Sequence, residues 1–338
     1  MKILAIESSC DETACAIVED GRKVLANTVA SQIDIHAKTG GVVPEVAARE
    51  HVLNIIPVLD DCLQEAGLDW DDIDAVAVTR GPGLLSSLII GTQTANVISY
   101  VKGKPLIPVQ HIVGHIYSNW LEREEEIEFP VMILTVSGGH NELVLMRGHN
   151  NFKVLGETRD DAAGEAFDKV ARILGLGYPG GPAISKLALE GDATAFSLPR
   201  SYLEKGSLDF SFSGLKTACL TVVKEHAEGG ISEKFKADLA ASFQEAVCEV
   251  LSDKLMMAAA KYPEVKEIHL AGGVSANGRL REMIEAKAGG QIFRYPTAMK
   301  FCTDNAAMIG AAAYYLYQLE PLNYRSCSNI VPTTEFEI

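Results

Sequence analysis

The sequence predicts an α/β protein built from two similar lobes, and three observations point to this class. The chain has 338 residues, about twice the length of an ordinary domain. Apolar runs rich in strand formers alternate with helical patterns, as they do in α/β folds. A strand, a turn of small residues and a second strand occur around Ser8 and again around Ser137. We expect a first lobe over residues 1–128 and a second over 129–338, and we leave open whether the final helix packs back on the first lobe.

Strand and helix signals follow one another through the first lobe. Apolar runs at 2–7 and 13–18 flank a polar turn and predict a β-hairpin. From Pro44, apolar residues recur at helical spacing up to Gly67, which predicts a long amphipathic helix. The other elements expected here are strands at 24–29, 75–78 and 105–109, helices at 84–101 and 111–121, and an acidic, solvated connector at 121–128.

The second lobe repeats this alternation. Strands are expected at 131–136 and 143–146, on either side of the small-residue turn 137–140. The later elements expected are helices at 162–174, 182–189, 215–227 and 234–260, a strand at 267–271, a glycine pair and a helix after Ser275. The repeated order of strand, turn and strand is consistent with an internal duplication.

Composition limits the classes of protein to which the chain can belong. Apolar residues make up 47% and charged residues 22%, so a large core can form and wholesale disorder is excluded. The first apolar run ends at Glu7, too early for a signal peptide, and no stretch approaches about 18 uncharged apolar residues. The seven cysteines include no CxxC pair, as expected for reduced thiols. We therefore predict a cytoplasmic protein that is neither secreted nor membrane-spanning.

The charge balance opposes contact with polyanions. The 30 basic and 45 acidic residues give a net charge of −15 at pH 7, which repels nucleic acid at long range. Binding of a nucleic acid would therefore need a local basic patch or a basic partner.

His111 and His115 form the first candidate site. They are four residues apart on an expected helix, so one transition-metal ion could bridge both imidazoles. Such a pair also arises by chance, and it lacks the glutamate of HExxH, which disfavours a metalloprotease. Asp304 could complete a two-histidine, one-carboxylate site suited to iron(II) or zinc. Its spacing before an apolar helical run instead favours a helix cap at Thr303 or Asp304.

Three turns are suited to anions. Small residues in the turns 8–12 and 137–140 would let backbone N–H groups approach a phosphate. The segment 270–277 places two glycines between a strand and a helix, where backbone can lie against a nucleotide base or ribose. Each glycine turn alone could be only a turn, but the three together favour a nucleotide site.

Nine motifs then occur in an order that resembles one family. They are IESSCDET, GGVVPE, GPGL, VQHIVGH, SGGH, DDAAGEAFDKVARILGLGYPGGP, DFSFSGLKT, AGGVSAN and FCTDN. Together they span nearly the whole chain and closely resemble the TsaD family of bacterial tRNA threonylcarbamoyltransferases, formerly labelled glycoproteases.

The resemblance implies a fold and a reaction. The fold is the duplicated, two-lobe, actin-like ATPase fold of sugar kinases, actin and heat-shock chaperones, with a nucleotide cleft between the lobes. The reaction transfers threonylcarbamoyl from threonylcarbamoyl-AMP to the exocyclic amine of adenosine at position 37 of tRNAs that read codons beginning with adenine. The resemblance also implies one divalent metal ion per subunit, Fe²⁺ or Zn²⁺.

The resemblance further implies partners. These are tRNA, a TsaE-like ATPase and a TsaB-like paralogue bound through the helices at 44–67 and 84–101, with a homodimer as a further possibility. The apolar faces of those two helices could alternatively belong to the chain's own core. Local contacts to tRNA phosphates are expected from basic residues, namely Arg279, Arg281, Lys287, Arg294 and Lys300.

The resemblance assigns the candidate site residue by residue. The implied metal ligands are His111, His115 and Asp304. The implied substrate contacts are Thr135, Val136, Ser137, Gly138, Gly139, Asp168, Gly181 and Asn277. Asp11 and Glu12 match positions near the reacting end of the cleft, where one of them could accept a proton.

Each of these assignments has a structural alternative. Asp11 and Glu12 could simply be solvated in a hairpin turn. Asp168 could pair with Lys169 or Arg172 on a helix surface, and Asn277 could cap the helix that follows it. A sugar kinase of the same fold and a nucleotide-dependent scaffold remain alternative functions, and neither needs a His-His-Asp site.

The chain departs from the family at a few positions. It has SSL after GPGL, HNE after SGG, and Ala306 after FCTDN. Its tail, SNIVPTTEFEI, lacks the arginine- and proline-rich ending of relatives, which puts a tRNA contact by that tail in doubt.

Overall fold

A computed structural model describes residues 1–226, 230–325 and 329–335 of the chain. The chain divides into two compact units. Unit 1 consists of Met1–Ile127, His149–Asn151 and Pro296–Ile338, and unit 2 consists of Glu128–Gly148 and Phe152–Tyr295. The expected single boundary at residue 128 therefore marks only the first crossing between the units, because the chain returns to unit 1 after Tyr295.

Helix α10 (Ala306–Leu319) explains the return to unit 1. Every residue from Ala306 to Ala313 is buried, and the helix packs against the strands of the unit 1 sheet. Gly310 lies so close to this sheet that a Cβ on it would be 2.7 Å from Cγ2 of Val18. Burying apolar surface stabilises a fold by about 25 cal/mol per Å², so a helix whose first eight residues are all apolar is expected to pack against the sheet that covers it.

The sheet of unit 1 has five strands in the order β3-β2-β1-β4-β5. Their bounds are Lys2–Glu7 (β1), Glu12–Glu19 (β2), Lys23–Ser31 (β3), Ala75–Gly81 (β4) and Leu106–Gln110 (β5). The first three strands pair antiparallel, whereas β4 pairs parallel with β1 and β5 parallel with β4. Parallel neighbours need crossover connections, and helices supply them here.

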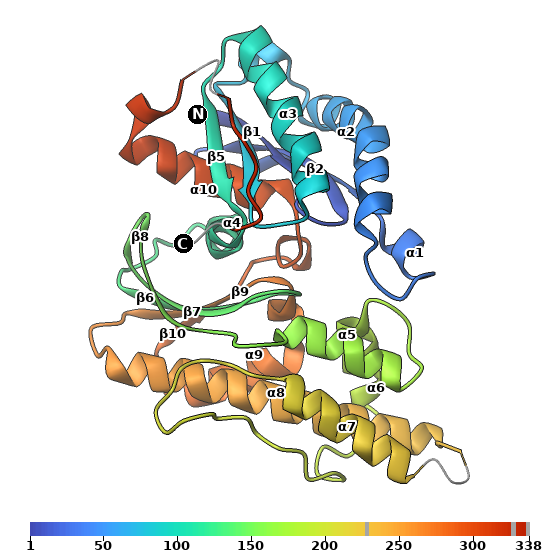
Figure 1. Cartoon of the computed structure of the whole chain (residues 1–338). Helices are drawn as coiled ribbons and strands as arrows, with labels where there is room; N and C mark the ends of the chain where they lie inside the picture. Colours follow the sequence, from blue (N-terminus) through green and yellow to red (C-terminus); the bar gives the residue numbers. More distant parts are fainter. Residues whose placement is uncertain (227–229, 326–328, 336–338) are drawn as a thin grey trace. The chain divides into compact units, whose positions relative to one another are not determined.

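Helices cover both faces of this sheet. Helices α2 (Pro44–Ala66) and α3 (Leu85–Lys102) lie on one face and α10 on the other (Figure 1). The buried stripe of α2 includes Ile55 and Leu59, which pack against alternate residues of β1 and β2. The two shorter helices are α1 (Ile33–His36) and α4 (His111–Tyr117).

Unit 2 has a second five-stranded sheet, in the order β10-β9-β6-β7-β8. Its strands are Val131–Val136 (β6), Asn141–Gly148 (β7), Asn151–Glu157 (β8), Glu267–Ala271 (β9) and Ile292–Arg294 (β10). Helices α5 to α9 lie on one face of this sheet (Figure 1) and bury a single apolar core against it. They are Ala163–Ile173 (α5), Gly180–Ala188 (α6), Ser213–Glu225 (α7), Glu233–Lys261 (α8) and Gly278–Lys287 (α9).

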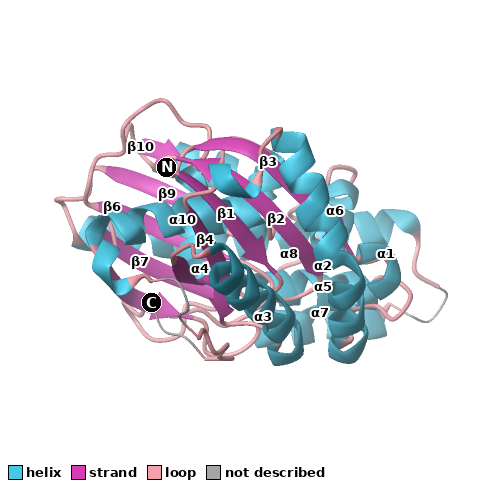
Figure 2. Ribbon diagram, turned by 90° about the horizontal axis from the view of Figure 1, so that it is seen from above, coloured by secondary structure: helices cyan, strands magenta, loops and turns pink. Residues whose placement is uncertain are grey.

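The two sheets repeat one topology (strands in magenta in Figure 2). In each unit the first two strands pair antiparallel, and a later strand pairs parallel with the first strand on its other side. A further strand then pairs parallel with that later strand. The predicted α/β class and the repeated strand–turn–strand unit are confirmed.

Most expected elements are present, with some corrections. The helix expected at 111–121 ends at Tyr117 and continues as a 3-10 turn, Ser118–Trp120. No apolar pattern predicted β8, most of which is exposed, or β10, which has only three residues. Ala227, the last residue of one expected helix, lies outside the described residues.

Two compositional expectations concern thiols and membranes. The six cysteines in the described part of the chain are free thiols, and Cys327 lies outside that part. Among the described residues, no helix combines the length and apolar character needed to cross a bilayer.

Candidate functional site

Two histidines of α4 form one side of the site. The helix begins at His111, directly after β5, and the Gln110 side chain caps it by accepting a hydrogen bond from the Val113 N–H at 2.7 Å. One helical turn separates His111 from His115, and their rings lie edge to face with centroids 4.7 Å apart. Both side chains are buried. The prediction that the two imidazoles share one helix face is confirmed.

Asp304 reaches the same cluster from a distant part of the chain. Its Oδ1 lies 3.2 Å from Nε2 of His115 and 3.5 Å from Nε2 of His111. The N-cap of α10 is Asn305, whose side chain accepts a hydrogen bond from the Met308 N–H at 3.1 Å. The cap expected at Thr303 or Asp304 is therefore wrong, and the Asp304 carboxylate faces the two histidines.

Gly114 allows α4 to approach α10. A Cβ on Gly114 would lie 2.7 Å from Cδ1 of Ile309 and 3.3 Å from Cγ of Met308. A larger residue would push the helices apart, because overpacking forces backbone shifts. The glycine between the histidines therefore keeps their helix close to the segment that carries Asp304.

The three residues fit a divalent metal ion. One donor atom from each of His111, His115 and Asp304 lies within 4.8 Å of the other two. The His115 ring is fully buried, yet neither nitrogen has a hydrogen-bond partner in the described part of the chain. Burying an unpaired polar group is costly, and metal ligation would satisfy one of these nitrogens. Two imidazoles and one carboxylate suit iron(II) or zinc and leave coordination positions open for substrate.

Glu7 belongs to the same cluster, and the sequence analysis did not identify it. It is the last residue of β1, it is 1% exposed, and its Oε2 lies 3.1 Å from Nδ1 of His111. That oxygen also accepts a hydrogen bond from the Thr79 hydroxyl at 2.5 Å, while Oε1 accepts one from the Ser9 N–H at 2.5 Å. The available signal was a carboxylate at the end of the otherwise apolar run ILAIE.

The charges of this cluster influence one another. Burial favours a raised pKa for Glu7, but the neighbouring His111 lowers the pKa of this carboxyl overall. Burial opposes a charged His111, yet the carboxylates of Asp304 and Glu7 raise its pKa to about 9. In the metal-free chain His111 is therefore protonated at neutral pH, and metal binding would release a proton.

Asp11 and Glu12 lie in the same unit, at the start of β2. Asp11 is only 7% exposed, so the alternative of a solvated turn does not describe it. The Glu12 carboxylate accepts a hydrogen bond from the Ser31 hydroxyl at 3.2 Å. Burial, followed by the charges of Asp11 and Asp304, raises the pKa of Glu12 to about 10. A catalytic role for either residue stays a prediction.

The turn at 137–140 lies in unit 2, against the start of α5. The N–H groups of Gly164 and Glu165 donate to the carbonyl oxygens of Ser137 and Gly138 at 3.3 and 3.1 Å. Within the described ranges, no group accepts a hydrogen bond from the N–H of Gly138 or Gly139. A Cβ on either glycine would meet no atom within 4 Å. The turn thus combines available backbone donors with open space, as an anion site requires.

Thr135 and Val136, which precede this turn, are both fully buried. Val136 belongs to the apolar core beneath the sheet. The Thr135 hydroxyl has no hydrogen-bond partner among the residues that the structure describes. Of the two side chains, only Thr135 therefore offers a polar group to a ligand.

Asp168 and Gly181 lie near the start of α6. Asp168 Oδ1 accepts a hydrogen bond from the Gly180 N–H at 2.7 Å. Lys169, considered as an alternative partner of Asp168, pairs instead with Asp161 at 2.7 Å and Glu165 at 2.9 Å. A Cβ on Gly181 would meet no atom within 4 Å. Substrate binding by Asp168 and Gly181 stays a prediction.

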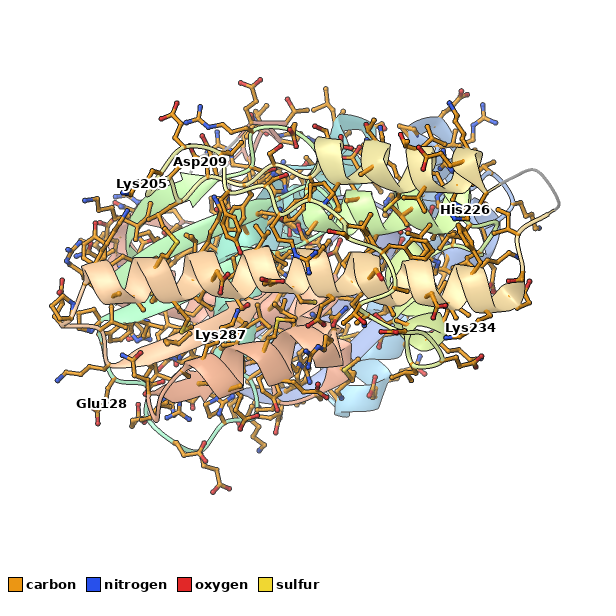
Figure 3. All side chains as sticks on the ribbon, turned by 90° about the horizontal axis from the view of Figure 1, so that it is seen from below. Glu128, Lys205, Asp209, His226, Lys234 and Lys287 are labelled. Atoms are coloured by element: carbon orange, nitrogen blue, oxygen red, sulfur yellow. The ribbon has the colours of Figure 1, made fainter. Side chains whose placement is uncertain are left out.

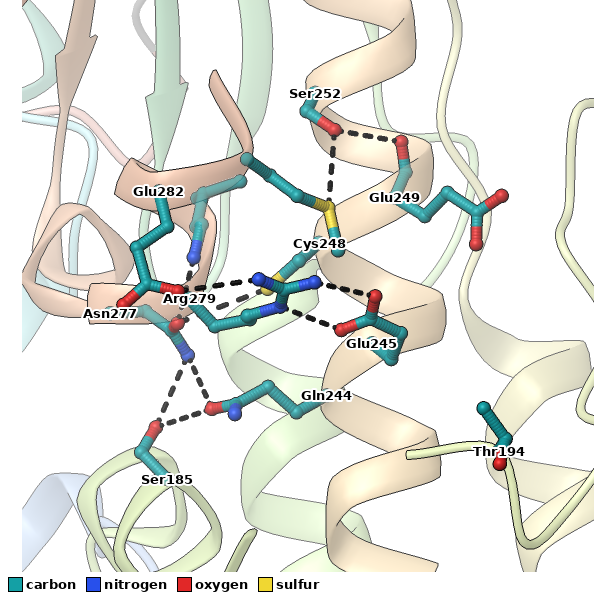
Figure 4. A network of polar contacts seen from close by, with 12 residues as sticks. Ser185, Thr194, Gln244, Glu245, Cys248, Glu249, Ser252, Asn277, Arg279 and Glu282 are labelled. Carbon is teal, nitrogen blue, oxygen red and sulfur yellow. Dashed lines mark hydrogen bonds and ion pairs between the residues drawn. The ribbon is translucent and has the colours of Figure 1, made fainter. Parts of the chain in front are cut away.

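Asn277 is the centre of a polar network (Figure 4). Its side-chain oxygen caps α9 by accepting a hydrogen bond from the Leu280 N–H at 3.1 Å. Its amide donates to Gln244 Oε1 at 2.9 Å and to Ser185 Oγ at 3.1 Å. The alternative of a helix cap is therefore confirmed, and the side chain already has partners before any ligand binds.

The basic residues expected to meet tRNA already have partners in unit 2. Arg279 forms two hydrogen bonds with Glu245, at 2.7 and 2.8 Å (Figure 4), and Lys287 pairs with Asp253 at 2.6 Å on the face drawn in Figure 3. The remaining contacts are Arg294 with Glu267, Arg281 over Tyr295, and Lys300, which is assigned to unit 1, over Phe301. Contact with phosphates would require these groups to exchange or share their present partners.

Comparison with known proteins identifies close relatives. The sequence model of one family, described as TsaD, tRNA N6-adenosine threonylcarbamoyltransferase, matches residues 23–311. A protein of Moorella thermoacetica named tRNA N6-adenosine threonylcarbamoyltransferase is 54% identical over 318 residues, which cover 93% of this chain and 92% of the relative. A protein of the same name from Bacillus cereus is 52% identical over 320 residues, covering 94% and 91%.

Solved structures resemble the fold at low identity. Component A of (R)-2-hydroxyglutaryl-CoA dehydratase from Acidaminococcus fermentans matches with a TM-score of 0.56 at 14% identity, over 94% of this chain and 99% of its own. Full-length HypF in its phosphate- and nucleotide-bound form matches with a TM-score of 0.59 at 14% identity, over 94% of this chain and 46% of its own. Both have the actin-like ATPase fold, so the fold class expected from the motifs is confirmed.

Proposed function

The chain belongs to the TsaD family of tRNA N6-adenosine threonylcarbamoyltransferases, and from this membership we propose that it transfers a threonylcarbamoyl group to tRNA. The donor is threonylcarbamoyl-AMP, and the acceptor is the exocyclic amine of adenosine at position 37 of tRNAs that read codons beginning with adenine. The observation that carries the proposal is identity of 52 to 54% with proteins of that name over nearly the whole chain. Family membership disfavours the kinase and scaffold alternatives.

His111, His115 and Asp304 hold one divalent metal ion, iron(II) or zinc, in this proposal. The support is the spacing of their donor atoms within 4.8 Å and the buried ring of His115, whose nitrogens form no hydrogen bond with any described residue. Such an ion, when bound, supplies a Lewis acid for substrate oxygens.

Unit 2 binds the adenylate in this proposal. The carbamoyl carbon is already activated as a mixed anhydride with AMP, so the chain mainly has to orient it. The N–H groups of Gly138 and Gly139 donate to the phosphate. Val136 and Ser137 hold the turn in place, because the Ser137 N–H donates to the His140 carbonyl oxygen at 2.8 Å. Thr135, Asp168, Gly181 and Asn277 surround the rest of the molecule.

Asp11 accepts the proton of the attacking amine in this proposal. The Glu12 carboxyl, with a pKa of about 10, holds its own proton at neutral pH in the metal-free chain and is a poorer acceptor. General-base catalysis contributes about 100-fold or more, so Asp11→Ala should lower the single-turnover rate by that factor. Adenylate affinity should not change, and Glu190→Ala, which removes an exposed carboxylate, is the control. If the single-turnover rate of Asp11→Ala equals that of the wild-type chain, Asp11 is not the proton acceptor.

The outer surfaces of α2 and α3 are the proposed contact with a TsaB-like paralogue. Their exposed apolar side chains include Leu53, Ile56, Val97, Tyr100 and Val101, which are 57 to 71% exposed. The alternative was that the apolar faces of these helices belong to the chain's own core. These five side chains are too exposed for that. A basic partner would also help an acidic chain to bind tRNA. A TsaE-like ATPase and a second copy of the chain remain further proposed partners. The proposed compartment is the cytoplasm.

One reconstitution tests the function. The purified chain is mixed with the partner proteins, threonine, bicarbonate, ATP and unmodified tRNA, with and without a chelator, and the nucleosides are analysed by mass spectrometry. We expect threonylcarbamoyladenosine only without chelator, and its recovery when iron(II) or zinc is restored. Full product in excess chelator would contradict the metal site. If the chain forms no product under any condition, while a relative assayed in parallel does, the proposed function is contradicted.

A further inference from the structure

Glu7 contacts one metal ligand on the side that faces away from Asp304. We propose that Glu7 is a positioning residue, which fixes the tautomer and the ring orientation of His111 for metal binding. The inference rests on the proposed function, because His111 is a ligand only if the chain holds a metal ion there.

The two ring nitrogens of His111 have different neighbours. Nδ1 lies 3.1 Å from Oε2 of Glu7 and 3.2 Å from the Ser9 hydroxyl, whereas Nε2 lies 3.5 Å from Oδ1 of Asp304. A carboxylate can only accept hydrogen bonds, so Glu7 requires a proton on Nδ1. In a neutral imidazole this leaves the lone pair on Nε2, the nitrogen that faces the metal cluster.

Glu7 is itself rigidly held. It ends β1, and its two oxygens accept hydrogen bonds from the Thr79 hydroxyl on β4 and from the Ser9 N–H. The side chain is buried, so water cannot readily replace these donors. A carboxylate fixed by two strands and a turn can hold the imidazole in one orientation, as carboxylate groups behind metal-bound histidines do.

The second histidine provides a comparison within the site. Neither nitrogen of His115 has a hydrogen-bond partner among the described residues, and no carboxylate of these residues holds it from behind. Its charged neighbour is Asp304, 3.2 Å from Nε2. Glu7 therefore acts on one ligand only, and its loss should weaken metal binding without abolishing it.

Glu7→Gln gives a sharp test because the amide reverses the polarity at His111. The Ser9 N–H is a donor and requires the amide oxygen on its side. The NH₂ group then faces Nδ1 of His111 and donates to it. That hydrogen bond moves the imidazole proton to Nε2, where it blocks the metal. A residue that only fills space would not produce this effect, since glutamine and glutamate have nearly the same shape.

Glu267→Gln is the matched control. Glu267 is also buried, and it pairs with a histidine at a similar distance, 2.9 Å from its Oε2 to Nε2 of His269. Both residues lie in unit 2, outside the metal cluster. The same substitution should therefore lower the melting temperature without changing metal affinity.

The measurement is Zn²⁺ affinity, obtained by competition with a chromophoric chelator, together with the visible spectrum of the Co²⁺-loaded full chain. We expect Glu7→Gln to weaken Zn²⁺ binding about 10- to 100-fold and to alter the Co²⁺ spectrum, while Glu267→Gln leaves both unchanged. Unchanged affinity in Glu7→Gln, or an equal loss in Glu267→Gln, would overturn the inference.

A second measurement uses the wild-type chain, so it does not depend on whether a variant folds. Imidazole ¹⁵N spectra of the Zn²⁺-loaded wild-type chain should show His111 protonated at Nδ1 and metal-bound at Nε2. A metal-bound Nδ1 would overturn the inference while leaving the metal-dependent function intact. A wild-type chain that binds no divalent metal would instead overturn both.

Discussion

Unit 1 and unit 2 build their sheets with the same strand order, but their first strands end in different chemistry. β1 ends with Glu7 and β6 ends with Val136, and each is followed by a serine. The parallel pairing ends at Ile6–Val78 in unit 1 and at Thr135–Ala271 in unit 2, so the next residue on the neighbouring chain segment is Thr79 in unit 1 and Gly272 in unit 2. The Thr79 hydroxyl donates to Glu7, whereas Gly272, with a φ of 85°, lies against the backbone of Val136.

The comparison shows how one topology can serve opposite charges. Carboxylate and imidazole side chains at the end of the first sheet attract a cation. At the end of the second sheet, glycines leave backbone N–H groups available, which is the arrangement that an anion site requires. The shared backbone positions a turn in both units, and the side chains decide which ion it favours.

Removing His115 should have the largest effect on the difference between the two units, because it removes part of the proposed cation site of unit 1. His115→Ala takes away a buried residue that we propose is a metal ligand, so we expect metal content near zero and transfer reduced at least about 100-fold. Metal content by plasma mass spectrometry and single-turnover transfer are the measurements. His226→Ala, which removes an exposed histidine of unit 2 (Figure 3), is the control. Full metal occupancy in His115→Ala would show that the cation site lies elsewhere.

The two buried glutamate–histidine pairs should differ in what they support. Burial alone would raise the pKa of Glu267, but hydrogen bonds from His269, Arg294 and the Glu128 N–H lower it to about 2. A lowered pKa stabilises the fold above the usual value of 4.5, and this stability is lost as the pH falls toward 2.

Glu267→Gln should therefore lower the free energy of unfolding by about 3 kcal/mol at pH 7 and by roughly half that or less near pH 3. Melting temperatures across this pH range test the expectation. An equal loss at both pH values would show that the charge of Glu267 contributes nothing.

The anion turn of unit 2 can be altered without disturbing its fold. A Cβ on Gly139 meets no atom within 4 Å, but it would occupy space beside the N–H groups that we propose bind the phosphate. We expect Gly139→Ala to weaken an adenylate analogue about 10-fold in calorimetry, and to leave Zn²⁺ affinity unchanged. Equal loss of both affinities would argue against separate roles for the two units. A control substitution is Gly148→Ala, at a glycine of unit 2 where an added Cβ also meets no atom within 4 Å.

The smallest effect is expected from the helix contact in unit 1. Gly114→Ala places a methyl group 2.7 Å from Cδ1 of Ile309, the flexible end of a side chain that can partly move away. We expect a loss of about 1 kcal/mol in unfolding free energy and a few-fold weaker Zn²⁺ binding. Chemical denaturation and the Zn²⁺ competition assay measure the two effects. A variant with unchanged metal affinity would show that α4 and α10 need not approach so closely.

Local patterns predicted most of the fold. The first hairpin, the long helix from Pro44 to Gly67 and the shared face of His111 and His115 depend on residues close together in sequence. The strands β8 and β10 were missed because one is largely exposed and the other is very short, so neither produces a clear apolar pattern. The expected boundary at residue 128 did not capture the return of the chain after Tyr295, which depends on packing between distant segments.

The sequence by itself determined the class of fold, the family and the two histidines, because strand alternation, helical spacing and motif order are all read along the chain. Only the tertiary structure excluded a helix cap at Asp304, since Asn305 takes the cap. It alone placed Glu7 beside His111, which is 104 residues away. Contacts of this kind depend on which faces of the sheet and helices pack together, and burial then determines whether a carboxylate is solvated or held against an imidazole.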